Sequence, residues 1–166
     1  PVLMKQKLQE IFLAKLDDIV NDISNNVKID KYYWGQVYTN CIEPYIKTLR
    51  DVNRVINTFQ FRYKLLSEEA ALEDMVALTV IEVLDPQLYQ WIGRNKDLIC
   101  STAKRSILSV FRNKKDYREF IVTELKNIGV NTDIGIKFLT TLFPVFADDI
   151  DEHSVGYISS NIRETM

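Results

Sequence analysis

The stretch TLRDVNRVINTFQFRYKLL, residues 48–66, has the spacing of an amphipathic helix. Thr48 offers an N-cap hydroxyl, and Asp51 three residues later places a carboxylate near the positive helix start. Apolar side chains recur at intervals of three and four residues, which marks one helix face. We expect that face to be buried; its members are Val52, Val55, Ile56, Phe59, Tyr63 and Leu66.

Two more helices are predicted before this stretch. The first ends at Asn25-Asn26, because Asn tolerates the left-handed turn of helix ends. Its expected buried face comprises Met4, Leu8, Ile11, Phe12, Leu16, Ile19, Val20 and Ile23. The second starts at Asp30, a good N-cap, and runs to a break at Pro44. Its inward residues are Tyr33, Trp34, Val37 and Cys41.

The stretch that follows is ambiguous between strand and helix. Residues 75–84, MVALTVIEVL, are rich in β-branched side chains, but no neighbouring segment alternates so as to pair with them. A helix is therefore favoured. Asp85-Pro86 then opens a short helix, as an N-cap followed by proline at the first helical position. This helix is expected to carry Leu88, Tyr89 and Ile92.

The last third of the chain has caps of the same kind. Residues 106–111 are predicted to be helical, and Asn113 and Asn131 are the N-caps of the last two helices. Gly129 ends the first of these helices and Pro144 the second. Their inward residues are expected to be Tyr117, Phe120, Ile121 and Leu125, then Ile134, Phe138, Leu139 and Leu142.

Composition agrees with a helical domain that has a substantial core. Of the 166 residues, 46% are hydrophobic and only five are Gly and four Pro, which disfavours turn-rich β folds. We predict an all-α fold, an irregular bundle of about seven to eight helices over residues 1–147. Residues 148–166 are expected to form an acidic polar connector or tail. The net charge of −2 gives no overall attraction to nucleic acid or anionic lipid.

Cellular location is predicted from cysteines and apolar runs. Cys41 and Cys100 have no metal-ligand spacing and are expected to be free buried thiols in a reducing compartment, hence a cytoplasmic chain. No apolar run approaches the roughly 20 residues of a transmembrane helix. The chain starts at Pro1 without an initiator Met, which we take as a sign of a longer parent protein.

Two charged regions are weak candidate sites. His153 follows the acidic run 148–152, whose oxygens could hold a divalent cation, but the spacing fits no EF-hand and a solvated connector is favoured. With one His and two isolated Cys, a hydrolytic triad or zinc site lacks ligands. Residues 94–118, the basic region, carry eight basic and two acidic residues, so 8 − 2 gives +6. A surface that faces its own acidic helices, or is simply solvated, is favoured there over phosphate binding.

A polar stripe lies opposite the buried face of residues 48–66. Arg50, Arg54 and Asn57 stand at i, i+4 and i+7 and therefore share one side of the helix. Two guanidiniums and an amide near a helix start form an anion-facing surface, since Arg donors match phosphate oxygens bidentately. The alternative is an ordinary exposed face whose charge Asp51 and nearby Glu residues absorb.

The segment TLRDVNRVIN resembles the Thr-x-Arg-Asp-Val-x-Arg-x-Ile-Asn signature of the KAP family of P-loop NTPases. Further elements follow in the family's order, and the similarity extends over roughly residues 44–98. These elements are Tyr63 and Leu66, Asp74-Met75-Val76-Ala77-Leu78, Leu84-Asp85-Pro86-Gln87-Leu88-Tyr89, Asn95-Lys96 and, further on, Leu142-Phe143-Pro144. Leu49 and Asn53 depart from the pattern, where the family often has Pro and Lys.

The resemblance implies a helical lid or C-terminal portion of such an ATPase. The chain has no G-x-x-x-x-G-K-[ST] loop, so the P-loop core, its partner, would lie elsewhere in the parent. ATP and Mg²⁺ would bind to the parent and not to this chain alone. By resemblance Arg50 would sense the γ-phosphate, with Arg54 the second choice, and both would bind the cofactor together with Asn57. Arg50 is expected to be exposed beside an apolar surface.

The resemblance also bears on the biological setting. Bacterial members look associated with phage defence and with membranes, and a homo-oligomer and contact of the parent with the cytoplasmic face of a membrane both fit it. Nucleic acid is not the expected partner. The alternative function is a non-enzymatic helical module that binds nucleic acid or an acidic protein through the basic region.

Overall fold

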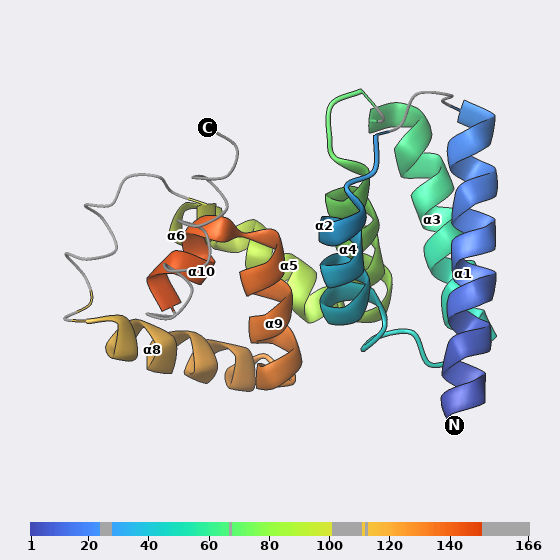
Figure 1. Cartoon of the computed structure of the whole chain (residues 1–166). Helices are drawn as coiled ribbons and strands as arrows, with labels where there is room; N and C mark the ends of the chain where they lie inside the picture. The colour runs from blue at the N-terminus through green and yellow to red at the C-terminus, as the bar shows by residue number, and fades with distance from the viewer. Residues whose placement is uncertain (24–27, 67, 101–110, 112, 151–166) are drawn as a thin grey trace. The chain divides into compact units, whose positions relative to one another are not determined.

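The computed structural model describes residues 1–23, 28–66, 68–100, 111 and 113–150 (Figure 1). All regular elements among them are helices, and these ranges contain no strand, so the predicted all-α fold is confirmed. The chain forms two compact units, Pro1–Tyr89 and Gln90–Met166, rather than the single bundle expected over residues 1–147. The division falls within one helix, α5 (Pro86–Arg94).

The first unit is built around α3 (Leu49–Leu66), which packs between α1 (Val2–Ile23) and α4 (Leu72–Leu84). A shorter helix, α2 (Lys31–Val37), lies against α4, and α1 and α3 stand side by side (Figure 1). The apolar faces of these helices meet in a core that includes Phe12, Val52, Val55, Phe59, Val76, Val80 and Ile81, none of them accessible to solvent. Packing of these faces, more than helix propensity, stabilises such helices.

The predicted buried face of α3 is confirmed at five of its six positions. Leu66 is 39% exposed, and it is the last residue of α3. Met4, in the first turn of α1, is also exposed, although it belongs to the face of that helix that was predicted to be buried. The helix favoured over a strand at residues 75–84 is confirmed as part of α4, which is buried on most of its circumference. Burial on several sides explains why its sequence shows no single apolar stripe.

The second predicted helix starts as expected but changes its geometry midway. The Asp30 carboxylate accepts hydrogen bonds from the backbone N–H groups of Tyr32 and Tyr33, so the predicted N-cap is confirmed. After Val37 the backbone becomes a π-helix, Tyr38–Ile42, and the N–H of Glu43 donates to the carbonyl of Tyr38 at 2.9 Å. The wider turn buries Tyr38, Cys41 and Ile42 together. Burial raises the pKa of the Tyr38 hydroxyl to about 12, with a smaller contribution from Glu43.

The second unit contains the rest of α5 and the short helix α6 (Lys96–Cys100), followed by α8 (Lys114–Asn127), α9 (Thr132–Leu142) and α10 (Pro144–Ile150). Both predicted Asn caps are confirmed: Asn113 accepts from the N–H of Asp116, and Asn131 accepts from that of Ile134. Apolar contacts from α10 to α6, α8 and α9 close the core of this unit.

Several expectations for this unit are wrong. The helix capped by Asn131 ends at Leu142, just before Pro144 as expected, but it is not the last helix. Pro144 opens a further helix, α10, since the first position of a helix does not need a backbone N–H. The helix continues past residue 147, so residues 148–150 are not part of a tail, and Ile150 is buried. Phe120 is 38% exposed, and Cys100 is exposed while Cys41 is buried as expected. The helix expected at 106–111 and the tail beyond 150 lie outside the described residues.

Replacing each of two glycines in the second unit with alanine should change the free energy of unfolding in opposite directions. Gly129 ends α8 with φ +79°, a left-handed conformation that costs about 1 kcal/mol or more for alanine, even though the new Cβ meets no atom within 4 Å. Gly93 lies inside α5 with equally open space, so alanine there should stabilise by about 0.5–1 kcal/mol.

Urea unfolding of the two variants tests this difference. The chain has two tryptophans, and Trp91 lies in the same unit as both glycines. In a Trp34→Phe background its fluorescence therefore reports on this unit. If the unfolding free energies of Gly93→Ala and Gly129→Ala changed in the same direction, the backbone angle φ of Gly129 would not be the cause of the difference.

Candidate functional site

The amino end of α3 is held by reciprocal hydrogen bonds. The N–H of Asp51 donates to the Thr48 hydroxyl at 3.1 Å, and the Asp51 carboxylate accepts from the N–H groups of Thr48 at 2.9 Å and Lys47 at 3.0 Å. This is the arrangement of a capping box. It engages the carboxylate with backbone donors. Among the residues that the structure describes, no acidic side chain is therefore bonded to Arg50.

These contacts also set the protonation of Asp51. Burial by itself would raise the pKa of its carboxyl group, but the hydrogen bonds from Lys47 and Thr48 and the positive charge of Arg54 outweigh burial and hold the pKa below its ordinary value. The carboxylate is consequently ionised at neutral pH and stabilises the start of α3.

Replacing Asp51 with Asn should give a stability loss that depends on pH. A carboxylate whose pKa is lower in the folded than in the unfolded chain stabilises the fold above its unfolded-state pKa, about 4, and loses this effect as the pH falls through its folded-state value. Urea unfolding should show Asp51→Asn less stable than the parent at neutral pH, with the gap narrowing as the pH falls below the unfolded-state pKa and through the lower folded-state value. A gap of constant size would contradict the role of the charge.

The three predicted site residues all lie on the exposed side of α3, opposite its buried face. Arg50 and Asn57 make no side-chain hydrogen bond or ion pair with any other residue in the described ranges. Arg54 differs, because its guanidinium Nη2 donates to the carbonyl oxygen of Val83 at 3.2 Å. The two arginines therefore differ: Arg54 is bonded to α4, whereas Arg50 has no partner in the described ranges.

Apolar side chains are exposed at the same end of the first unit as Arg50. Leu49, the first residue of α3, is 49% exposed. In Figure 1, α1 and α3 both start at the lower end of this unit, and the first turn of α1 exposes Val2, Leu3 and Met4. An exposed arginine beside exposed apolar residues matches the geometry that we expect of a surface covered by another protein part.

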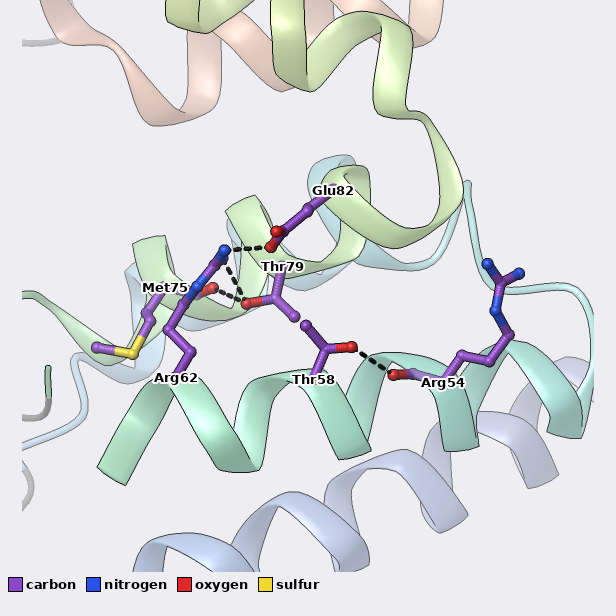
Figure 2. A network of polar contacts seen from close by, with 6 residues as sticks. All are labelled: Arg54, Thr58, Arg62, Met75, Thr79 and Glu82. Carbon is purple, nitrogen blue, oxygen red and sulfur yellow. Dashed lines mark hydrogen bonds and ion pairs between the residues drawn. The ribbon is translucent and has the colours of Figure 1, made fainter. Parts of the chain in front are cut away.

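A polar network between α3 and α4 was not predicted from the sequence. Arg62 forms an ion pair with Glu82 and donates to the Thr79 hydroxyl at 2.9 Å, and that hydroxyl donates to the Met75 carbonyl at 2.7 Å (Figure 2). Thr79 is fully buried, so these bonds satisfy a polar group that would otherwise destabilise the core. The sequence carries no sign of this network, since its partners meet only once the two helices pack.

The other predicted sites, the basic region and the acidic run before His153, lie partly or wholly outside the described residues. Within the basic region, Arg94 donates to the Gln90 carbonyl and Lys114 to the Asp148 carbonyl at 2.9 Å, while Lys104, Arg105 and Arg112 lie outside the described residues. His153 lies outside them too. Among the residues that the structure describes, no group of His, Cys, Asp or Glu could hold a metal ion. No helix within the same ranges has the length and apolar character to cross a membrane.

The chain was compared with known protein families, curated proteins and solved structures. No family model, curated protein or solved structure matches the chain. The candidate site is therefore defined by its own geometry: a capped helix start, an exposed arginine without a partner in the described part of the chain, and apolar side chains at the same end of the unit.

Proposed function

We propose that this chain is the helical lid portion of a P-loop ATPase of the KAP type, in which Arg50 responds to the γ-phosphate of ATP. The observation that carries the proposal is the state of Arg50 within the segment TLRDVNRVIN. Its guanidinium is exposed at the start of α3 and bonded to no other residue in the described ranges, while the nearest acid, Asp51, is engaged by backbone N–H groups.

The chemistry expected of Arg50 follows from its shape and place. A guanidinium donates two parallel hydrogen bonds to phosphate oxygens, and the positive end of α3 favours the same anion. Charge accumulates on the γ-phosphoryl oxygens during transfer, so a cation already held there lowers the barrier. Arg50 is preferred to Arg54 because Arg54 is bonded to Val83, and Asn57, two turns further along, would provide an amide donor on the same side of the helix.

The nucleotide itself would be held mainly by a core outside these 166 residues. A P-loop supplies backbone N–H groups, a lysine and a hydroxyl ligand for Mg²⁺, and the sequence has no such loop. In the first unit, Arg50 is an exposed arginine without a partner in the described ranges, and the described residues contain no cluster suited to the metal. The exposed Leu49 and the first turn of α1 would contact that core.

Comparing the intact gene product with residues 1–166 tests this proposal. The intact protein should hydrolyse ATP in the presence of Mg²⁺, and the 166-residue chain alone should release no phosphate above background. Hydrolysis by the isolated chain, or none by the intact protein under conditions in which it is folded, would contradict the proposal. The basic region remains the alternative site, and binding of an oligonucleotide that weakens steeply with salt would favour it.

A further inference from the structure

Arg54 makes a contact that its place in the sequence does not predict. It stands one turn after Arg50, and its guanidinium Nη2 donates to the carbonyl oxygen of Val83 at 3.2 Å. Val83 is the last residue but one of α4. The final carbonyls of any helix have no partner within the helix, so a donor from a neighbouring helix satisfies one of them.

The charges of α4 make this contact more significant. Glu73 and Asp74 lie in the first turn of α4, and its last turn contains no basic residue. Acidic residues complement the start of a helix and basic residues its end, so α4 is complemented by its own side chains only at the start. Arg54 supplies the missing positive charge from α3. The Arg62–Glu82 ion pair and the Arg62–Thr79 bond join the same two helices two turns further along α3 (Figure 2).

We propose that Arg54 is a positioning residue that fixes the amino end of α3 to the carboxyl end of α4 and thereby holds Arg50 in place. This inference rests on the proposed function of Arg50 and deepens it. Arg54 then makes no contact with phosphate and acts through Arg50 alone. Movement of Arg50 on nucleotide binding would be passed directly to the end of α4, where α5 begins.

The contact itself is tested on the 166-residue chain by amide hydrogen exchange. The N–H of Asp85 is bonded to the Ile81 carbonyl in the last turn of α4. Removing the guanidinium in Arg54→Ala should lower protection of this amide and its neighbours about fivefold, the effect of one hydrogen bond. Lys64→Ala is the matched control, because Lys64 is an exposed cation on α3 with no partner in the described ranges. Equal protection in both variants would overturn the capping role.

The positioning role is tested by a double-mutant cycle in the intact ATPase. If Arg54 acts through Arg50, Arg54→Ala lowers kcat with little change in KM, and adding it to Arg50→Ala causes no further loss. Arg54→Lys, which can still donate to the Val83 carbonyl, should restore most of the rate. Losses that multiply, or a rise in KM alone, would identify Arg54 as an independent ligand and overturn the proposal.

The two experiments separate this inference from the function beneath it. If the intact protein hydrolyses no ATP, the proposed function fails, and the positioning role fails with it. Hydrogen exchange would in that case still decide whether Arg54 caps α4. If hydrolysis is present and the cycle shows independent losses, the function stands and only the role of Arg54 is wrong.

Discussion

Arg50→Ala should lower kcat for ATP hydrolysis by the intact protein about 100-fold, while the affinity for ATP changes much less. The size follows from the removal of one preorganised donor to a transition-state oxyanion, which costs about 100-fold to 1,000-fold in other enzymes. The effect falls on kcat because charge on the γ-phosphoryl group increases between bound substrate and transition state. Steady-state phosphate release gives kcat, and equilibrium titration with a fluorescent ATP analogue gives the affinity.

Two control variants make this result specific. Arg50→Lys keeps the charge but loses the planar pair of donors, so it should retain only part of the rate. Asn53→Ala removes an exposed polar side chain from the next turn of the same helix and should leave kcat unchanged. Normal turnover in Arg50→Ala, or an equal loss in Asn53→Ala, would contradict a phosphate contact by Arg50.

Phe59→Ala should destabilise the first unit by about 3–5 kcal/mol. Phe59 is completely buried, and its ring stacks on that of Tyr63 with centroids 5.4 Å apart. Truncation therefore removes a large apolar side chain from the centre of the contacts that α3 makes with α1 and α4, and leaves a cavity. Urea unfolding followed by circular dichroism measures the loss in unfolding free energy. The midpoint of thermal unfolding of Phe59→Ala should also lie well below that of the parent protein.

Phe61 provides the matched control for Phe59. It lies two residues further along the same helix, carries the same side chain and is 71% exposed. Phe61→Ala should change the free energy of unfolding by no more than about 0.5 kcal/mol. Comparable losses in the two variants would mean that the buried face of α3 is not the one described here.

Features that depend on neighbouring residues in the chain were predicted well. The caps at Asp30, Asn113 and Asn131 are local hydrogen bonds between a side chain and the next turn, and the sequence shows both partners. The left-handed Gly129 is equally local. The buried face of α3 follows from helical periodicity alone, except at Leu66, where the helix ends.

Features that depend on packing between helices were missed. The π-helix at Tyr38–Ile42 has no periodic signal of its own. The helix that begins at Pro144 is stabilised by burial of Phe146 and Ile150 in the core of the second unit. At the candidate site, periodicity placed Arg50, Arg54 and Asn57 on one face correctly. It could not show that Arg54 bonds to a carbonyl 29 residues away, because that pairing arises only when α3 and α4 pack.

The most direct test of the central proposal is to read the sequence that precedes residue 1 in the gene. A helical lid of a KAP-type ATPase predicts a G-x-x-x-x-G-K-[ST] loop after an apolar strand, followed by a later strand that ends in Asp. That finding would supply the phosphate cradle and the metal ligands that Arg50 needs beside it. A preceding sequence without such a loop, or a start codon directly before Pro1, would contradict the proposal.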